Sequence, residues 1–149
     1  MTAAHVSETA MNPLLSFTVA LVLLVPFQVA AQEEERAQRL EDARAAVEAR
    51  LTRSTLKDVN VTAADVKRVR RITIGVAPFN KNPRDDASSA LTAAWQPALQ
   101  HLKSFDEIAV RVGPNYSVTC SARALADTTI SLWGERLTRT CREQRSARK

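Results

Sequence analysis

Glycine and cysteine are scarce in this chain, which has three glycines and two cysteines among 149 residues. The glycines are scattered, so the sequence has no glycine-rich loop for phosphate and no Gly-x-Ser-x-Gly elbow of a serine hydrolase. The two cysteines, Cys120 and Cys141, lie 21 positions apart and cannot form the Cys-x-x-Cys pair of a redox enzyme. These shortages argue against several common enzyme classes.

Histidine is equally scarce, with two residues in the chain. His5 falls in the predicted leader described below, which leaves His101 as the one histidine of the remaining chain. His101 lies near the end of a predicted helix and has no Cys, Asp or Glu at ligand spacing, which argues against zinc or copper. We therefore predict no metal and no other cofactor.

Two pairs of adjacent acids are the remaining candidates for acid–base chemistry. Asp85–Asp86 and Asp106–Glu107 both fall in predicted loops or at their ends. Neighbouring loop acids are usually solvated or cap a helix, so we predict that the protein is not an enzyme and has no catalytic residue. The alternative is a small secreted hydrolase that uses these acidic loops.

The amino-terminal region has the pattern of a signal peptide. Leu14–Val25 is a run without charge, and Val29 and Ala31 supply the small residues that precede a cleavage site. We predict a signal peptide over residues 1–31, with cleavage between Ala31 and Gln32 and with Met11 as an alternative true start. The protein would then be periplasmic or secreted. The alternative is a membrane-anchored periplasmic protein with a helical stalk, because residues 14–31 are just long enough to span a bilayer.

The chain after Ala31 is basic and the size of one small domain. It keeps all 21 Lys and Arg residues but loses one of the 16 acids, Glu8, to the leader. We divide it into a helix at 32–57, a small α/β domain at 58–142 and a basic tail at 143–149. Such a basic tail can attract anionic lipid headgroups or lipopolysaccharide of the envelope. The alternative is a solvated tail that aids solubility. Nucleic acid is not expected, because no aromatic residues interleave the tail for base stacking.

Hydrophobic periodicity predicts most of the elements. Leu40, Val47 and Leu51 recur at helical spacing, whereas strand-like alternation begins at Ile72 and again at Ile108. Pro97 should kink or divide the helix that contains it. The predicted elements are a helix at 33–53, a short helix at 63–69, a strand at 72–76, a loop at 81–89, a helix at 90–104 and a strand at 108–112. This order predicts a small mixed sheet with one crossover helix.

The segment from Tyr116 to Cys141 reads as either a hairpin or a helix. An uninterrupted helix would hold the cysteines about 30 Å apart, whereas a disulfide requires Cα atoms within about 7 Å. An exported chain favours the Cys120–Cys141 disulfide, so we favour a β-hairpin turning near Asp127, with Ile130 in its second arm. The end of this second arm and the residues that follow it form our candidate interaction surface. The surface comprises Trp133, Glu135, Arg136, Arg139, Arg142 and Arg145.

Part of the chain, about residues 71–139, resembles the amino-terminal domain of TolB-like proteins. The resemblance rests on a strand that ends in Ala77-Pro78-Phe79 and on the Leu-Trp-x-Glu-Arg run over residues 132–136. It implies an envelope-associated, non-catalytic α/β module that works through protein contacts. It implies no catalytic residue. We therefore expect an exported binding or scaffold module of the bacterial envelope whose partner is an envelope protein.

Overall fold

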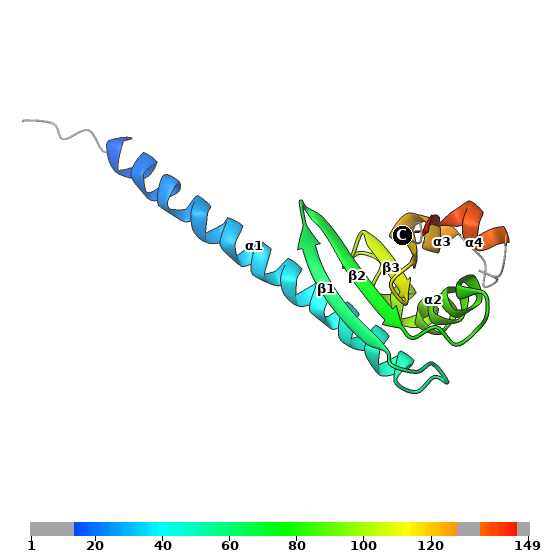
Figure 1. Ribbon diagram of the computed structural model, residues 1–149. Coiled ribbons are helices and arrows are strands. Elements are labelled where there is room, and N and C mark those ends of the chain that lie inside the picture. Colours follow the sequence, from blue (N-terminus) through cyan, green and yellow to red (C-terminus); the bar gives the residue numbers. More distant parts are fainter. Residues whose placement is uncertain (1–13, 128–134, 146–149) are drawn as a thin grey trace, which may run out of the picture. The chain divides into compact units, whose positions relative to one another are not determined.

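The computed structural model describes residues 14–127 and 135–145. The chain divides into two units, Met1–Glu35 and Arg36–Lys149, and the second contains the sheet and the hydrophobic core. The elements of this second unit form an α/β fold with a five-stranded mixed sheet (Figure 1). The fold class expected from the sequence is therefore confirmed.

Helix α1 runs without interruption from Leu14 to Leu51 and includes the predicted helix at 33–53. Its carboxyl half buries one stripe of side chains spaced three or four residues apart, as the periodicity predicted. The exposed side is reinforced by Arg44, which forms an ion pair with Glu41 at 2.6 Å and another with Glu48 one turn later. The buried stripe comprises Leu40, Ala43, Val47 and Leu51.

Strands β1 (Asn60–Val66) and β2 (Val69–Val76) form an antiparallel hairpin. The predicted short helix at 63–69 is therefore wrong. Thr62 and Asp65 have the spacing of a helix cap, but Val61 pairs with Ile74 and both are buried in the core. Burial of the alternating apolar side chains thus outweighs a local capping pattern. Lys67 and Arg68 make the two-residue turn with φ values of 54° and 68°.

Helix α2 (Pro83–Gln100) connects β2 to the parallel strand β3 (Glu107–Val112). It starts earlier than expected, because Asn82 caps it by accepting the Arg84 N–H at 3.2 Å and because Pro83 suits the first turn. The predicted loop at 81–89 is therefore mostly helical. The helix also continues through Pro97 instead of dividing there, held by the buried side chains on both sides of it, Ala94, Trp95 and Ala98.

The chain then forms β4 (Tyr116–Ser121), the short helices α3 (Ala122–Asp127) and α4 (Glu135–Thr140), and β5 (Arg142–Arg145). The antiparallel strand pair expected at this end is present, but β4 pairs with β5 and not with a segment around Ile130. Ile130 lies outside the described residues. The expected turn near Asp127 is helical, in keeping with its alanine-rich sequence.

The predicted disulfide between Cys120 and Cys141 is confirmed, with Cα atoms 4.4 Å apart. It joins the end of β4 to the residue that precedes β5. The bond closes the segment that holds both short helices, so neither the favoured hairpin nor an uninterrupted helix describes residues 122–141. The structure satisfies the disulfide by turning the chain through α3 and α4.

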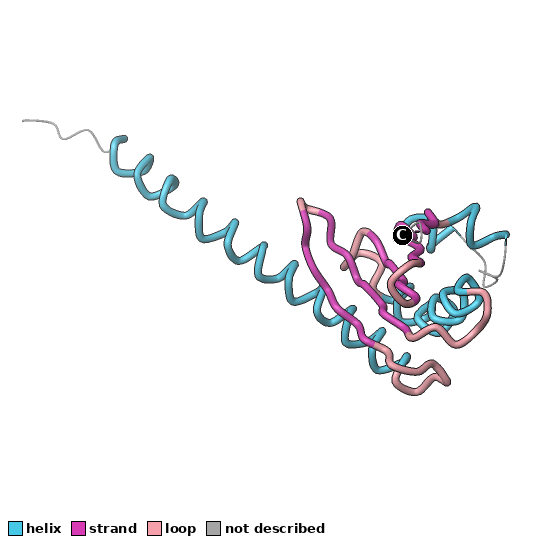
Figure 2. The backbone as a smooth tube through the Cα atoms, viewed as in Figure 1, coloured by secondary structure: helices cyan, strands magenta, loops and turns pink. Residues whose placement is uncertain are grey.

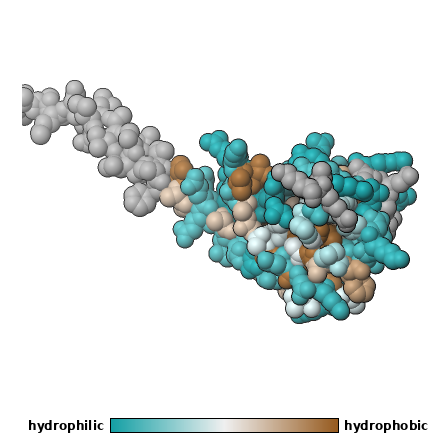
Figure 3. Space-filling model, viewed as in Figure 1, coloured by the Kyte–Doolittle hydropathy of each residue, from teal (hydrophilic) through white to brown (hydrophobic). Residues whose placement is uncertain are grey.

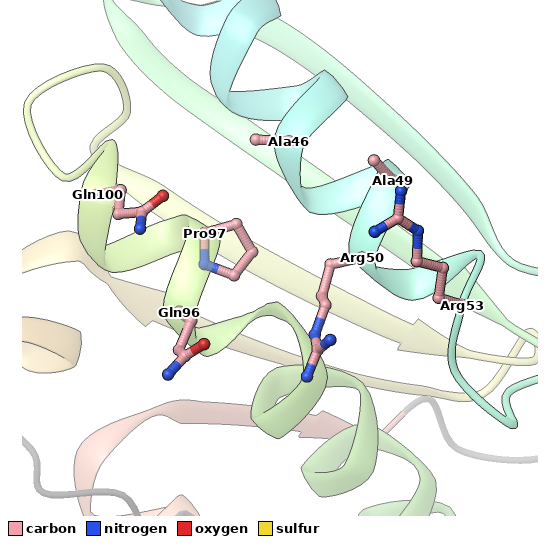
Figure 4. Close-up of a pocket in the computed structure, with 7 residues that line it drawn as sticks. All are labelled: Ala46, Ala49, Arg50, Arg53, Gln96, Pro97 and Gln100. Atoms are coloured by element: carbon pink, nitrogen blue, oxygen red, sulfur yellow. The ribbon is translucent and has the colours of Figure 1, made fainter.

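The sheet order is β1-β2-β3-β4-β5, and β2–β3 is the parallel pair. Both α1, from Arg36 onward, and α2 lie over the same face, as the close-up in Figure 4 shows. The opposite face carries mainly small or polar side chains, including Thr62, Thr73, Arg111 and Thr119. The buried face comprises Val61, Ile72, Ile74, Val76, Ile108, Val110, Val112, Tyr116, Val118 and Cys120.

Candidate functional site

The predicted interaction surface lies on α4 and β5. Arg136 and Arg139 are exposed on α4, which begins at Glu135. Trp133, the one aromatic residue of that prediction, lies outside the described residues. The predicted cleavage residues Ala31 and Gln32 are both exposed on α1.

The arginines on β5 are engaged with nearby acids. Arg142 Nη2 lies 4.0 Å from Glu107 Oε1 across the sheet. Arg145 Nε donates to Glu143 Oε1 at 2.9 Å, and its guanidinium lies 5.9 Å from the centre of the Tyr116 ring. Both side chains have a carboxylate partner but remain exposed, at 66% for Arg142 and 64% for Arg145.

Glu143 links β5 to the start of α2. Arg84 Nη2 donates to Glu143 Oε2 at 2.8 Å, so the carboxylate is shared by two arginines. Partial burial alone would raise the pKa of Glu143, but the hydrogen bonds from Arg145 and Arg84 outweigh it, and the pKa is lowered. Burial raises the pKa of the neighbouring Tyr116. The cluster of Glu143, Arg84, Arg145 and Tyr116 joins β5 to the start of α2, and we call it the clasp.

One acidic pair considered for catalysis forms ion pairs with two neighbouring arginines. Arg70 Nη2 lies 3.0 Å from Asp106 Oδ1, and Arg71 Nη2 lies 2.6 Å from Glu107 Oε2. The hydrogen bond from Arg70 lowers the pKa of Asp106. These contacts support a structural role at the amino ends of β2 and β3.

The other acidic pair supports the loop between β2 and α2. Asp86 is buried and its carboxylate accepts the N–H groups of Phe79 and Asn80, both at 3.0 Å, and the Asn80 side-chain amide at 2.6 Å. These hydrogen bonds to the buried Asp86 therefore fix the backbone of the loop. Asp85 lies exposed on the first turn of α2, where a negative charge is favourable.

Phe79, held on this loop, has a relative exposure of 74%. The Lys57 Nζ atom lies 5.8 Å from the centre of its ring. Ala77 N donates to Lys57 O at 3.3 Å, which places the loop after β2 beside the loop after α1 (Figure 2). An exposed aromatic ring on a fixed loop has the features of a contact residue. Elsewhere, the face shown in Figure 3 is mostly hydrophilic, with apolar residues in small patches.

A groove lies between α1 and α2 (Figure 4). It comprises two adjoining hollows of about 220 Å³ each, which share Arg50 and Gln96. On the α1 side, small Ala46 and Ala49 leave room between the helices. The remaining lining residues are Arg53, Thr92, Ala93, Trp95, Pro97 and Gln100.

The two arginines of the groove differ from those on β5. Neither the Arg50 nor the Arg53 side chain has a hydrogen bond or ion pair within the described part of the chain, and both are exposed. Their backbones are joined, because Arg53 N donates to Arg50 O at 3.2 Å and extends the helical turn. Both residues line the groove, and Figure 4 shows the Arg50 side chain extending toward α2 while the Arg53 guanidinium lies beside Ala49.

Pro97 adds an acceptor on the other wall. Proline has no N–H, so the carbonyl of Ala93 lacks its usual helical donor. Ala93 and Pro97 both line the groove, together with the amide side chains of Gln96 and Gln100. The groove thus offers cationic donors on α1 and acceptors as well as donors on α2.

A third hollow, of about 300 Å³, lies on the uncovered face of the sheet near the β3–β4 turn. Its lining includes Arg111, Asn115, Ser117 and Gln144, and Arg111 has no ion pair among the described residues. It contains one cation, whereas the groove contains two on a single wall.

The groove could not be found from the sequence alone. The helix at 33–53 was predicted, but nothing in the pattern shows that its last turn lies beside α2. The loop position of Phe79 could be predicted from the sequence. Phe79 directly follows the proline that ends a strand, and an aromatic residue at that point falls in a loop. In the described residues there is no cluster of three potential metal ligands and no helix apolar and long enough to cross a bilayer.

No protein-family model, curated protein or solved structure matches this chain.

Proposed function

We propose that the protein is an exported, non-catalytic binding module of the bacterial cell envelope that acts through contacts with a protein partner. The observation that carries the proposal is Phe79, an aromatic side chain that is 74% exposed on a loop fixed by the buried Asp86. A fixed ring loses little conformational entropy when a partner covers it, so it suits an interface anchor.

The neighbourhood of Phe79 supports the same proposal. Lys57 places a cation 5.8 Å from the centre of the ring, so a partner surface with an apolar pocket and an acidic rim would fit. The TolB-like resemblance includes Ala77-Pro78-Phe79, and the module that it implies also works through protein contacts.

The proposed location is the periplasm or the extracellular space. The Cys120–Cys141 disulfide supports it, because such bonds persist in oxidising compartments. The proposal includes removal of residues 1–31 by cleavage after Ala31. Intact mass of the protein from separated soluble and membrane fractions tests this part, since a soluble form that begins at Gln32 is expected and a membrane-bound full chain would contradict it.

Site-specific photo-crosslinking tests the binding function. A photoreactive phenylalanine analogue is placed at Phe79 or, as the control, at Val66, which is also apolar and 54% exposed. In source cells, we expect a discrete crosslinked protein adduct from position 79 and not from position 66. Absence of an adduct at 79, or the same adducts from both positions, would refute the assignment of Phe79 as the anchor.

A further inference from the structure

We infer that the groove between α1 and α2 binds an acidic peptide segment, with Arg50 and Arg53 holding two of its carboxylates. The inference deepens the proposed function and rests on it, because the segment would belong to the same protein partner. It names a second contact surface and the chemistry of the partner that this surface recognises.

The charge of the segment follows from the α1 wall. Arg50 and Arg53 lie three positions apart, and neither side chain has an ion pair among the described residues. A carboxylate accepts two parallel hydrogen bonds from a guanidinium, which makes it the best-matched side-chain partner. Acids three or four positions apart on a helix, or two apart on a strand, place two carboxylates on one side of a segment, where each can bind one arginine.

The α2 wall indicates a peptide in preference to a bare anion. The Ala93 carbonyl lacks the helical donor that Pro97 cannot supply and can accept an N–H group from a ligand. Gln96 and Gln100 can each donate and accept through their amides. A segment with N–H donors as well as carboxylates complements both walls, whereas phosphate or sulfate has no N–H group for the acceptors on α2.

The dimensions agree with a short segment. The α2 wall extends from Thr92 to Gln100, a length of about 12 Å at 1.5 Å per residue. About four residues of extended chain, or two turns of helix, cover this distance. Ala46 and Ala49 have small side chains, so the backbone of the segment can approach α1 closely.

The test uses the full chain, kept in solution by a mild non-ionic detergent, and two fluorescent peptides. Both are blocked eight-residue alanine peptides, one with two glutamates four positions apart and the other with glutamines at the same places. Fluorescence anisotropy at low salt should show that the glutamate peptide binds at least ten-fold more tightly. The combined substitution Arg50→Gln and Arg53→Gln should remove this preference.

A matched control removes the same charge elsewhere. Arg142→Gln combined with Arg145→Gln also deletes two cations and should change the affinity less than two-fold. Equal losses in the two double variants would show that general attraction to a basic protein explains the binding, and equal binding of the two peptides would likewise overturn the inference. Circular dichroism of each variant confirms that it is folded.

Two further outcomes separate the possible occupants. The Phe79→Ala variant should bind the glutamate peptide normally, so failure of the Phe79 proposal remains distinguishable from failure of this one. Sedimentation of the unliganded protein should show a monomer. A dimer that Arg50→Gln with Arg53→Gln abolishes would mean that a second copy of the chain occupies the groove, which would overturn the inference.

Discussion

Arginines occur in two contrasting surroundings in this molecule. On β5, Arg145 donates to Glu143 at 2.9 Å and Arg142 lies 4.0 Å from Glu107. Beside the interhelical groove, Arg50 and Arg53 have no ion pair within the described residues. The density of arginine is higher near the carboxyl terminus, but the two β5 arginines have carboxylate partners and the two groove arginines have none among the described residues. Counting charges along a sequence therefore does not locate a charged binding surface.

The difference follows from where the acids lie. Glu143 is part of β5 itself and Glu107 is on β3, so the β5 arginines have carboxylates within reach. On α1, Glu41 and Glu48 are both bound by Arg44, six residues before Arg50. Arg50 in the last turn of α1 and Arg53 just after it are left without an acid, and their charges suit the negative end of the helix dipole.

The largest expected effect on stability comes from removing the disulfide that joins the end of β4 to the residue before β5. Replacing both Cys120 and Cys141 by alanine should lower the free energy of unfolding by about 3 kcal/mol, because the disulfide restricts a loop of about 20 residues in the unfolded chain. Urea denaturation of the variant and the parent measures the loss. A difference below about 1 kcal/mol would show that α4 and β5 are held mainly by other contacts.

A smaller loss is expected at the clasp. Glu143→Gln removes the carboxylate shared by Arg84 and Arg145 and should cost about 1–2 kcal/mol, a value reduced by solvent screening at the exposed Arg145. Urea denaturation at neutral pH measures it. Equal stability of the variant and the parent would mean that solvent replaces both hydrogen bonds without loss.

The same substitution has a pH signature. Because the pKa of Glu143 is lowered in the folded protein, its contribution is present above the unfolded value of 4.5 and disappears as the pH falls through the folded value. The stability difference between the parent and Glu143→Gln should therefore be constant from pH 7 to about pH 5 and narrow below about pH 4. A stability difference that increases below about pH 4 would contradict the ion pairing of Glu143 with the two arginines.

The smallest expected effect is in the groove. Arg50→Gln with Arg53→Gln should change the free energy of unfolding by less than about 0.5 kcal/mol, because neither side chain has a described partner to lose. Thermal unfolding measures this change. A loss of more than 1 kcal/mol in the free energy of unfolding would assign the two arginines a structural role. They would then not differ from the paired arginines on β5.

The apolar elements of the fold were accessible from the sequence. Ile72 and Ile108 begin alternating runs that bury one face, and the helical spacing of Leu40 to Leu51 identifies α1. The disulfide followed from two cysteines in a chain with a predicted export signal. These features depend on local periodicity or simple pairing, which one sequence contains.

The remaining elements depend on tertiary contacts. β1 was mistaken for a helix because Thr62 and Asp65 imitate a cap, and only pairing with β2 decides the matter. Arg142–Arg145 is wholly polar, so its strand character comes from pairing with β4. The groove requires α1 and α2 to lie side by side, a relation between distant segments that no local pattern specifies.

Mapping of the acidic peptide on the protein by NMR would test the central claim most directly. Backbone amide shifts of the full chain are recorded while the blocked glutamate peptide is added. The account predicts that the largest changes lie at Ala46, Ala49, Gln96 and Gln100, with small changes at Arg142 and Arg145. The largest changes on α4 and β5, with the groove unaffected, would contradict it.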